Sequence, residues 1–292
     1  MNPPARPLSR PRTPHSSPLT PPRPMHPWRL SELTYHETKD PNFALAVLPW
    51  GATEPHNLHL PHGTDNYQVE ALADRACELA HGRGANVVLL PGVPFGTQTN
   101  MKRCPLALNM HPTTQLAVLR DLCGSLEDAG VRRLLIVNGH GGNNLKFALR
   151  ELMEQTPVHL FLCDWFGPLT KAAAADAGVA LAPGGHADDL ETSLILHLRP
   201  DLVARNDDGT LRADAGATRP FGPACLNAGA VYASRRWDLS TTHTGHGDPH
   251  GASAEKGAKL FAAISDRLGE AVHELATEPE SDHFPFAAGG ES

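Results

Sequence analysis

The sequence predicts an α/β fold with a mostly parallel central sheet and helices packed on both of its faces. Short, continuously apolar segments of strand length alternate with longer segments whose apolar residues recur at helical spacing. Neither an internal repeat nor a shift in composition interrupts this alternation after residue 28. Ligands of such folds bind at the carboxyl ends of the strands, so we expect a functional site there.

Four segments are predicted to be strands because each is a short apolar run, and runs of this kind form buried strands. The first run, FALAVLPW, is ended by Gly51, and the third leads into a histidine flanked by glycines. The predicted strands are residues 43–50, 86–93, 132–140 and 158–165.

Five segments are predicted to be helices. In the first, Val69, Leu72, Ala73 and Ala76 recur at three- and four-residue intervals, and glycines end the pattern. The fourth stops before a proline, which cannot continue a helix. The predicted helices are residues 67–84, 113–130, 144–156, 190–198 and 252–276.

Both chain ends are expected to lie outside the folded domain. Residues 1–27 carry ten prolines, several arginines and no acidic residue, which is typical of a disordered segment. They contain no apolar stretch of the kind found in secretory signals, and Met25 is an alternative start. We therefore expect one domain over residues 28–278, followed by a flexible tail over residues 279–292.

The composition of the 292-residue chain indicates an ordinary globular protein and argues against several functions. Its net charge of −7 speaks against a nucleic-acid partner, and no apolar run approaches the ~18 residues needed to span a membrane. The five cysteines form no C-x-x-C pair, which favours free buried thiols in a reducing cytoplasm over disulfides or structural zinc. The 17 histidines stand out as candidates for metal binding or proton transfer.

The densest group of such residues is TEPHNLHLPHGTD, residues 53–65, directly after the first strand. Glu54 and His56 are spaced so that both side chains can enter one site, and Asp65 precedes the next helix. A carboxylate at that position can bridge two metal ions, and mixed imidazole and carboxylate ligation suits Zn, Mn or Fe. The alternative is a polar loop in which Asp65 only caps the helix.

Two further clusters lie at a strand end and at a helix start. In VNGHGGN, the glycines on both sides of His140 let a ligand approach the backbone. The cluster also precedes a helix start, where backbone N–H groups are free. In GGHADDLETS, His186 precedes a helix and Glu191 lies about one turn inside it. A simple turn in the first cluster and helix capping by acidic residues in the second are the alternatives.

The remaining histidines of these regions are expected to have lesser roles. His59 is expected to orient a metal ligand, and His62 to be an ordinary loop histidine. The glycine-rich stretch THTGHGDPHGASAEKG adds His243, His246 and His250 as weaker candidates.

Taken together, these motifs resemble those of the creatininase (creatinine amidohydrolase) family. They occur in the family order and span about residues 45–260: E-P-H, H-L-P, G-T-D, N-G-H-G-G-N, H-A-D-D-L-E-T-S and G-D-P followed by A-S-A-E-K-G. The resemblance implies a three-layer α/β/α fold, often assembled as a hexamer, with a dinuclear metal centre of Zn, Mn or Fe. A homo-oligomer is therefore expected.

The resemblance also assigns roles to individual residues. It implies that Glu54, Asp65 and His140 hold one metal. It implies that His56 and Asp65 hold the second, with Asp65 bridging the two. By the same resemblance, His186 matches a histidine that acts on the substrate or the leaving group.

Two departures from creatininase itself argue against creatinine as the substrate. Gly142 stands where creatininase has a glutamate ligand of the second metal, so Glu191 is the candidate for the missing carboxylate. No aromatic residue closely precedes His186, where creatininase carries a flap tryptophan, and Trp165 is the nearest tryptophan expected to line the pocket. The chain resembles instead the H-G-G-N branch, which includes deformylating amidohydrolases and a peptide-trimming enzyme of a redox-cofactor pathway.

We therefore expect a metal-dependent amidohydrolase that cleaves a non-peptide C–N bond of a small amide or lactam with a metal-activated water. His186 is expected to act as general acid or base, and Glu191 as a ligand or the base. Backbone N–H groups around Gly141 and Gly142 are expected to hold the oxyanion. Two alternatives are a peptidase that trims a short cofactor-precursor peptide, and a non-catalytic metal- or ligand-binding member of the fold.

Overall fold

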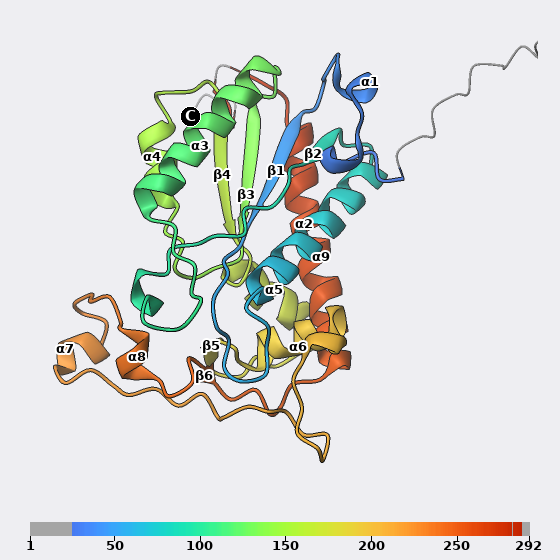
Figure 1. Cartoon of the computed structure of the whole chain (residues 1–292). Helices are drawn as coiled ribbons and strands as arrows, with labels where there is room; N and C mark the ends of the chain where they lie inside the picture. The colour runs from blue at the N-terminus through green and yellow to red at the C-terminus, as the bar shows by residue number, and fades with distance from the viewer. Residues whose placement is uncertain (1–24, 282, 288–292) are drawn as a thin grey trace, which may run out of the picture.

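A computed structural model describes residues 25–281 and 283–287 and shows a central sheet of four parallel strands (Figure 1). Every residue of the two middle strands is buried, as expected for a sheet covered on both faces. The strand order is β2-β1-β3-β4, with β1 (Leu45–Trp50), β2 (Val87–Leu89), β3 (Arg133–Asn138) and β4 (His159–Asp164).

Alternate side chains of the strands enter two separate cores, because successive residues of a strand point to opposite faces. On one face, Leu45 and Val47 of β1 and Leu135 and Val137 of β3 pack in a core with α2, α5 and α9. Helix α6 packs against α2 and α9. These helices are α2 (Thr64–Gly82), α5 (Pro168–Asp176), α6 (Asp189–Leu198) and α9 (Ala254–Thr277).

On the other face, Ala46, Leu48 and Trp50 of β1 pack in a second core. That core is completed by two helices, α3 (Pro112–Asp128) and α4 (Lys146–Leu152). Figure 1 shows α3 and α4 on one side of the sheet and α2 and α9 on the other. The three-layer α/β/α arrangement confirms the predicted fold class.

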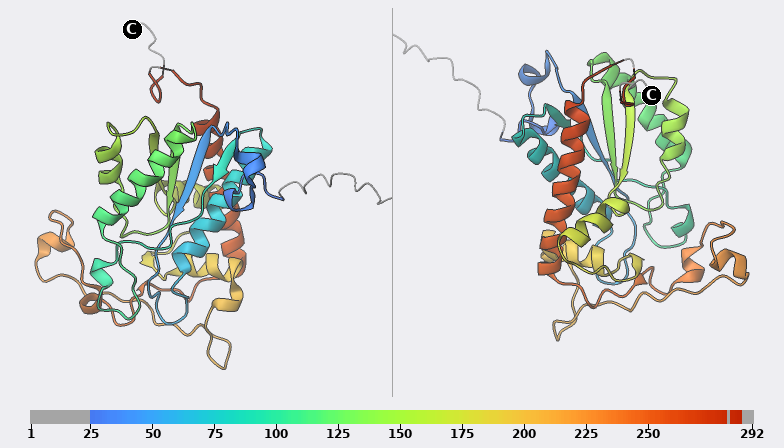
Figure 2. Two further views of the ribbon diagram at one scale, coloured as in Figure 1. Left: turned by 45° about the horizontal axis from the view of Figure 1, so that its top comes forward. Right: turned by 180° about the vertical axis from the view of Figure 1, so that it is seen from behind.

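A long segment between α6 and α9 runs past the carboxyl ends of the sheet strands. It extends as an arm in all three views (Figures 1 and 2, orange). Its last strand, β6, pairs antiparallel with β5. The elements concerned are β5 (Gly184–His186), η3 (Pro200–Leu202), α7 (Ala224–Asn227), α8 (Trp237–Ser240) and β6 (His246–Gly247).

All nine predicted elements are present, with shifted ends. The predicted strand 86–93 is reduced to β2, because the chain turns away at Pro91 and Gly92, and Val93 forms only an isolated bridge to Trp50. Helix α2 begins three residues early, which places Asp65 inside its first turn rather than before it. The sequence analysis missed α5, the β5–β6 pair and six short helices: η1 (Leu30–Glu32), α1 (Tyr35–Thr38), η2 (Thr99–Met101), η3, α7 and α8.

The two predicted tails meet the structure differently. The N-terminal tail lies almost entirely in residues 1–24, outside the described residues. Beyond residue 278, Glu280 pairs with the buried Arg133 at 2.6 Å, and Phe284 is only 9% exposed. The packed part of the chain therefore continues past the predicted boundary. Within the described residues, no helix has both the length and the apolar character needed to cross a membrane.

The cysteines of the described residues are all free thiols. Cys77 and Cys123 are buried, as expected, whereas Cys225 is exposed on the arm.

Candidate metal centre

The first part of the site is the loop that joins β1 to α2. Its hydrogen bond from Glu54 N–H to the carbonyl of His62, 3.0 Å long, closes the loop on itself. This closure brings the first turn of α2 back beside the end of β1. Glu54, His56 and Asp65 thereby become neighbours, and all three are almost completely buried.

His140 reaches the same place from the end of β3. Asn138, the last residue of the strand, accepts a hydrogen bond from His140 N–H (3.2 Å) and donates one to the His140 carbonyl (3.0 Å). These bonds fold the chain sharply after the strand. The neighbouring strand β1 lies directly beside β3, so the two loops meet at the same edge of the sheet.

His186 and Glu191 come from the other side, from β5 and the first turn of α6. Ala187 between them has a positive φ of 51°, and its N–H donates to the Glu191 carboxylate. Asp188 caps α6 by accepting from Glu191 N–H at 3.1 Å. The capping expected as the alternative therefore exists: Asp188 caps the helix, and Glu191 accepts an N–H just before its start. The same Glu191 Oε2 also lies 3.9 Å from His56 Nε2, so the side chain faces the site as well.

Asp65 lies at the middle of the cluster, and its two oxygens face different histidines. Oδ1 lies 3.1 Å from His56 Nε2, and Oδ2 lies 3.1 Å from His140 Nδ1. Glu54 Oε1 lies 3.0 Å from the same His140 Nδ1, while Glu191 Oε2 lies 3.9 Å from His56 Nε2. One carboxylate thus joins two groups of potential ligands.

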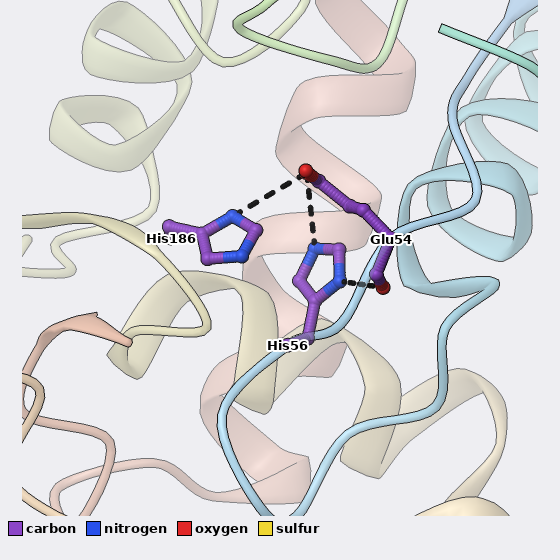
Figure 3. A group of neighbouring side chains, drawn as sticks. All are labelled: Glu54, His56 and His186. Atoms are coloured by element: carbon purple, nitrogen blue, oxygen red, sulfur yellow. Dashed lines mark hydrogen bonds and ion pairs between the residues drawn. The ribbon is translucent and has the colours of Figure 1, made fainter. Parts of the chain in front are cut away.

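Three sets of side chains have ligand atoms within 4.8 Å of one another. The first comprises Glu54, Asp65 and His140, and the second His56, Asp65 and Glu191. The third adds His186 to Glu54 and His56, as Figure 3 shows. His186 Nδ1 lies 3.5 Å from Glu54 Oε1, so it is close enough to join the ligands, a possibility that the sequence analysis did not consider.

The three imidazoles share one arrangement, which fits a metal. In each ring, one nitrogen faces carboxylates and the other lies beside a backbone carbonyl: Glu54 for His56 (3.0 Å), Thr97 for His140 (3.2 Å) and Pro55 for His186 (3.0 Å). Donation to a carbonyl puts the hydrogen on the outer nitrogen and leaves the inner lone pair free. Metal-binding histidines are held in this way.

The carboxylates fit a metal as well. Glu54 Oε2 and Asp65 Oδ2 are buried without a hydrogen-bond partner among the described residues. Asp65 Oδ2 lies 3.1 Å from His140 Nδ1, but the two atoms are not in hydrogen-bonding geometry. Burying unpaired carboxylate oxygens is costly, and a cation between them removes the cost. The donor set of imidazole and carboxylate suits Zn, Mn or Fe.

Without a metal, protons bound to the imidazoles supply the positive charge of the cluster. Burial lowers the pKa of His56, but Asp65 and the other carboxylates outweigh it and raise the pKa to about 10. Burial also lowers the pKa of His140 and the charge of Glu54 raises it, and the resulting pKa lies well above its usual range. Burial raises the pKa of Glu54 and Asp65, yet the neighbouring imidazoles hold both below their usual values.

The pKa values of two groups in the cluster are shifted in the direction that favours the uncharged form. Burial raises the pKa of Glu191 to about 8, with the charge of His56 opposing. Burial, together with the charge of His56, lowers the pKa of His186 to about 4. Perturbed groups of this kind gather at functional sites. A carboxyl group that titrates near neutral pH can both accept and donate a proton.

Some predicted site residues lie apart from the cluster. Trp165 is 1% exposed and packs in the core between the sheet and α2, α5 and α9, so the expectation that it lines the pocket is not supported. His59 is buried and bonds Thr192 Oγ1 at 2.8 Å, beside Glu191 in α6, and His62 is exposed. Gly141 is exposed next to His140, while Gly142 leaves no room for a side chain beside His140 and Thr97.

The weaker histidine candidates are divided by the structure. His246 is the β-strand partner of His186 and lies at the edge of the site. His243 and His250 instead form half-exposed pairs with Asp214 and Asp248, each at 2.6 Å.

One aromatic residue at the site escaped the sequence analysis. The ring of Trp237, from α8 in the arm, lies 4.9 Å from the His186 ring, edge to face. The residue is partly exposed. Trp237 follows His186 by about 50 residues in an irregular segment, and no local pattern connects the two. Its only sequence signal is that it is the fourth tryptophan of the chain.

Comparison with known proteins agrees with this geometry. The family model described as creatinine amidohydrolase, of the creatininase family, matches residues 31–272. The chain belongs to the creatininase family. This confirms the family predicted from the sequence motifs, and members of the family are hydrolases.

Two relatives in this family have different printed activities. A mycofactocin precursor peptide peptidase from Mycobacterium tuberculosis is 29% identical over 246 residues, covering 80% of this chain and 86% of its own. A creatinine amidohydrolase from Pseudomonas putida is 28% identical over 178 residues, covering 54% of this chain and 65% of its own.

Solved creatininase-family structures share the fold. A candidate creatinine amidohydrolase from Bacteroides fragilis has a TM-score of 0.77 at 35% identity and covers 88% of this chain and 99% of its own. Two creatininases named as an Mn form and a Zn-Zn form have TM-scores of 0.60 and 0.59, both at 23% identity. They cover 86% and 85% of this chain and 99% and 98% of theirs, and they show the fold alone.

Proposed function

We propose that this creatininase-family hydrolase uses two divalent metal ions to cleave the C–N bond of a small amide or lactam. The observation that carries the proposal is the position of Asp65, whose two oxygens each lie 3.1 Å from a different histidine. In the proposal, one ion is held by Glu54, Asp65 and His140, and the other by His56, Asp65 and Glu191. Zn, Mn and Fe suit these donors.

Bound metals would supply an activated water with a pKa near ~7 and a Lewis acid that polarises the amide carbonyl. The chain's own groups then have to manage protons. In the proposal, Glu191 accepts the proton of the attacking water on the carboxylate oxygen that does not bind the metal. His186 relays a proton to the leaving nitrogen: its Nδ1, which faces the cluster with a free lone pair, accepts the proton and then releases it.

Two further parts of the site are proposed to contact the substrate. The N–H of the exposed Gly141, next to His140, is available to hold the developing oxyanion. The role first expected of Trp165 passes to Trp237, whose partly exposed ring beside His186 is suited to pack against a planar amide. Gly142 acts by its lack of a side chain rather than as an oxyanion donor.

A peptidase is the second candidate, and one observation favours it. The M. tuberculosis relative, named as a precursor peptide peptidase, covers 80% of this chain, against 54% for the creatinine amidohydrolase of P. putida. The same metals and residues could cleave a peptide amide, since the chemistry of attack is identical. The difference lies in whether the site admits a chain or only a small molecule.

Metal-reconstituted protein should be incubated with a panel of small amides and lactams, creatinine included, and with short peptides. We expect hydrolysis of a small amide, which a chelator abolishes and Glu191→Gln lowers by about 10²–10⁴-fold. The control Glu78→Gln, in a surface ion pair with Arg75, should retain full activity. Cleavage of peptides alone would identify a peptidase, and two bound metals without any turnover would identify a binding protein.

A further inference from the structure

A buried glutamine lies against the outer side of the His140 ring. Gln98, just before η2, is fully buried, and its side chain lies 3.1 Å from His140 Nε2. The carbonyl oxygen of Thr97 lies 3.2 Å from the same nitrogen. On the inner side, Nδ1 faces Glu54 and Asp65. The ring is therefore clamped between a pair of carboxylates and a pair of loop groups.

These contacts decide which ring nitrogen carries hydrogen. Nδ1 needs a free lone pair to bind a metal, so the hydrogen of the neutral ring must sit on Nε2. The carbonyl of Thr97 can only accept, which agrees with a hydrogen on Nε2. A second donor has no place there, because Nε2 then offers no lone pair. The side chain of Gln98 must consequently present an acceptor to His140.

The hydrogen bonding of Gln98 leads to the same result. With its amide nitrogen toward His140, the amide oxygen Oε1 is buried without a hydrogen-bond partner in the described part of the chain. Turning the amide by 180° exchanges the two atoms, which occupy nearly the same space. Oε1 then faces His140 Nε2–H and is no longer unpaired, the conflict of two facing donors disappears, and the amide nitrogen takes the former place of Oε1.

We propose that Gln98 is a positioning residue that accepts a hydrogen bond from His140 Nε2–H, jointly with the Thr97 carbonyl, and thereby presents Nδ1 to a metal. The inference rests on the proposed metal centre and deepens it. It also gives Gly142 a reason. A Cβ at this position would collide with both His140 Nε2 and the Thr97 carbonyl, so a side chain here would break the clamp.

The test is the metal affinity of variants, measured by competition with a chromophoric chelator for Zn²⁺ and for Mn²⁺. Gln98→Leu should weaken one of the two bound ions by about 10–100-fold and leave the other unchanged. Gln98→Glu retains an acceptor and should bind both ions like the wild type. Gln98→Met, which keeps the length of the side chain, provides the same comparison if the leucine variant does not fold.

Gln115→Leu is the matched control. Gln115 is also fully buried, and it bonds Asn143 Oδ1 at 2.8 Å and Thr97 Oγ1 at 3.2 Å without touching a proposed ligand. This variant should lose stability but keep both metal affinities. Unfolding of each metal-free variant, followed by circular dichroism, separates the two effects.

Two results would overturn the role of Gln98. Either Gln98→Leu and Gln98→Met bind both ions as tightly as the wild type, or Gln98→Glu binds as weakly as Gln98→Leu. The second result would mean that Gln98 acts as a donor. A wild-type protein that binds no metal at all would instead contradict the proposed metal centre, so the two failures are distinguishable.

Discussion

At the residue scale, the site consists of side chains that cannot be buried as they are without a cation. Glu54, Asp65 and Glu191 bring three carboxyl groups into one cluster, and within the described part of the chain Glu54 and Asp65 each leave an oxygen unpaired. Each of three imidazoles has one ring nitrogen facing these carboxyl groups. The other nitrogen of each ring lies beside a backbone carbonyl. Each feature has a structural explanation alone, but together they form a candidate set of metal ligands.

A prediction at this scale concerns Trp237. Trp237→Ala should raise KM for a small amide substrate by about threefold to tenfold with little change in kcat, because an aromatic contact of roughly 1 kcal/mol is lost equally from substrate and transition state. Trp28→Phe is the control, because the Trp28 indole N–H donates to Asp74 away from the site. Steady-state kinetics check this, and an unchanged KM in Trp237→Ala would remove Trp237 from the proposed pocket.

The residues of the metal loop could be predicted from sequence because they crowd a short segment after a strand. Glu54, His56 and Asp65 lie within twelve positions, and the strand order then brings His140 beside them. Trp237 and Gln98 could not be predicted in this way. They reach the cluster through irregular loops whose course is set by tertiary contacts, and neither stands in a motif.

At the scale of elements, the sheet and its longer helices followed from periodicity. Their burial is continuous, so the apolar pattern is strong. The missed helix α5 has a proline at its first turn and a run of four alanines, a signal that was present but not used. The strands β5 and β6 have three and two residues, too few for any pattern, and they form only because the arm passes beside His186.

A prediction for the packing of elements concerns two helical glycines. Gly257→Ala should destabilise the protein by about 1–3 kcal/mol, because the new Cβ would overlap the Ser193 carbonyl where α9 crosses α6. Gly124→Ala in α3 meets nothing within 4 Å and should stabilise by about 0.5–1 kcal/mol. Urea unfolding checks both, and equal effects of the two substitutions would contradict the close α6–α9 packing.

At the scale of the whole molecule, stability should depend on pH through the cluster. His56 has a pKa of about 10 in the folded metal-free protein against 6.5 ordinarily. A raised folded pKa gives stability that is complete below about pH 6.5 and is lost as pH rises toward 10. The free energy of unfolding should therefore fall by about 1.4 kcal/mol per pH unit for each such proton in this window.

Saturating Zn²⁺ should remove this loss, because the metal replaces the protons as the cation. Denaturant unfolding of chelator-treated and metal-loaded protein between pH 6.5 and 10 provides the measurement. His56→Gln without metal should have a shallower slope than the wild type. A metal-free wild type whose stability does not change across this range would contradict the charge arrangement described for the cluster.

The assembly state is a further prediction for the whole molecule. We expect a homo-oligomer, a hexamer by family resemblance, and light scattering after size exclusion should give six times the 31.3 kDa chain mass. The arm is the natural place for a subunit contact, since Tyr232 and Leu239 on it are 87% and 55% exposed. A monomer at micromolar concentration would contradict this expectation.

The most direct test of the two-metal centre is the metal content of Asp65→Ala, measured by elemental mass spectrometry after dialysis. Asp74→Ala, on the same helix but paired with Arg29, is the control. The wild type and Asp74→Ala should each hold about two ions per chain, whereas Asp65→Ala should lose both, because its oxygens face both sets of ligands. Retention of two ions by Asp65→Ala would contradict a centre shared through Asp65.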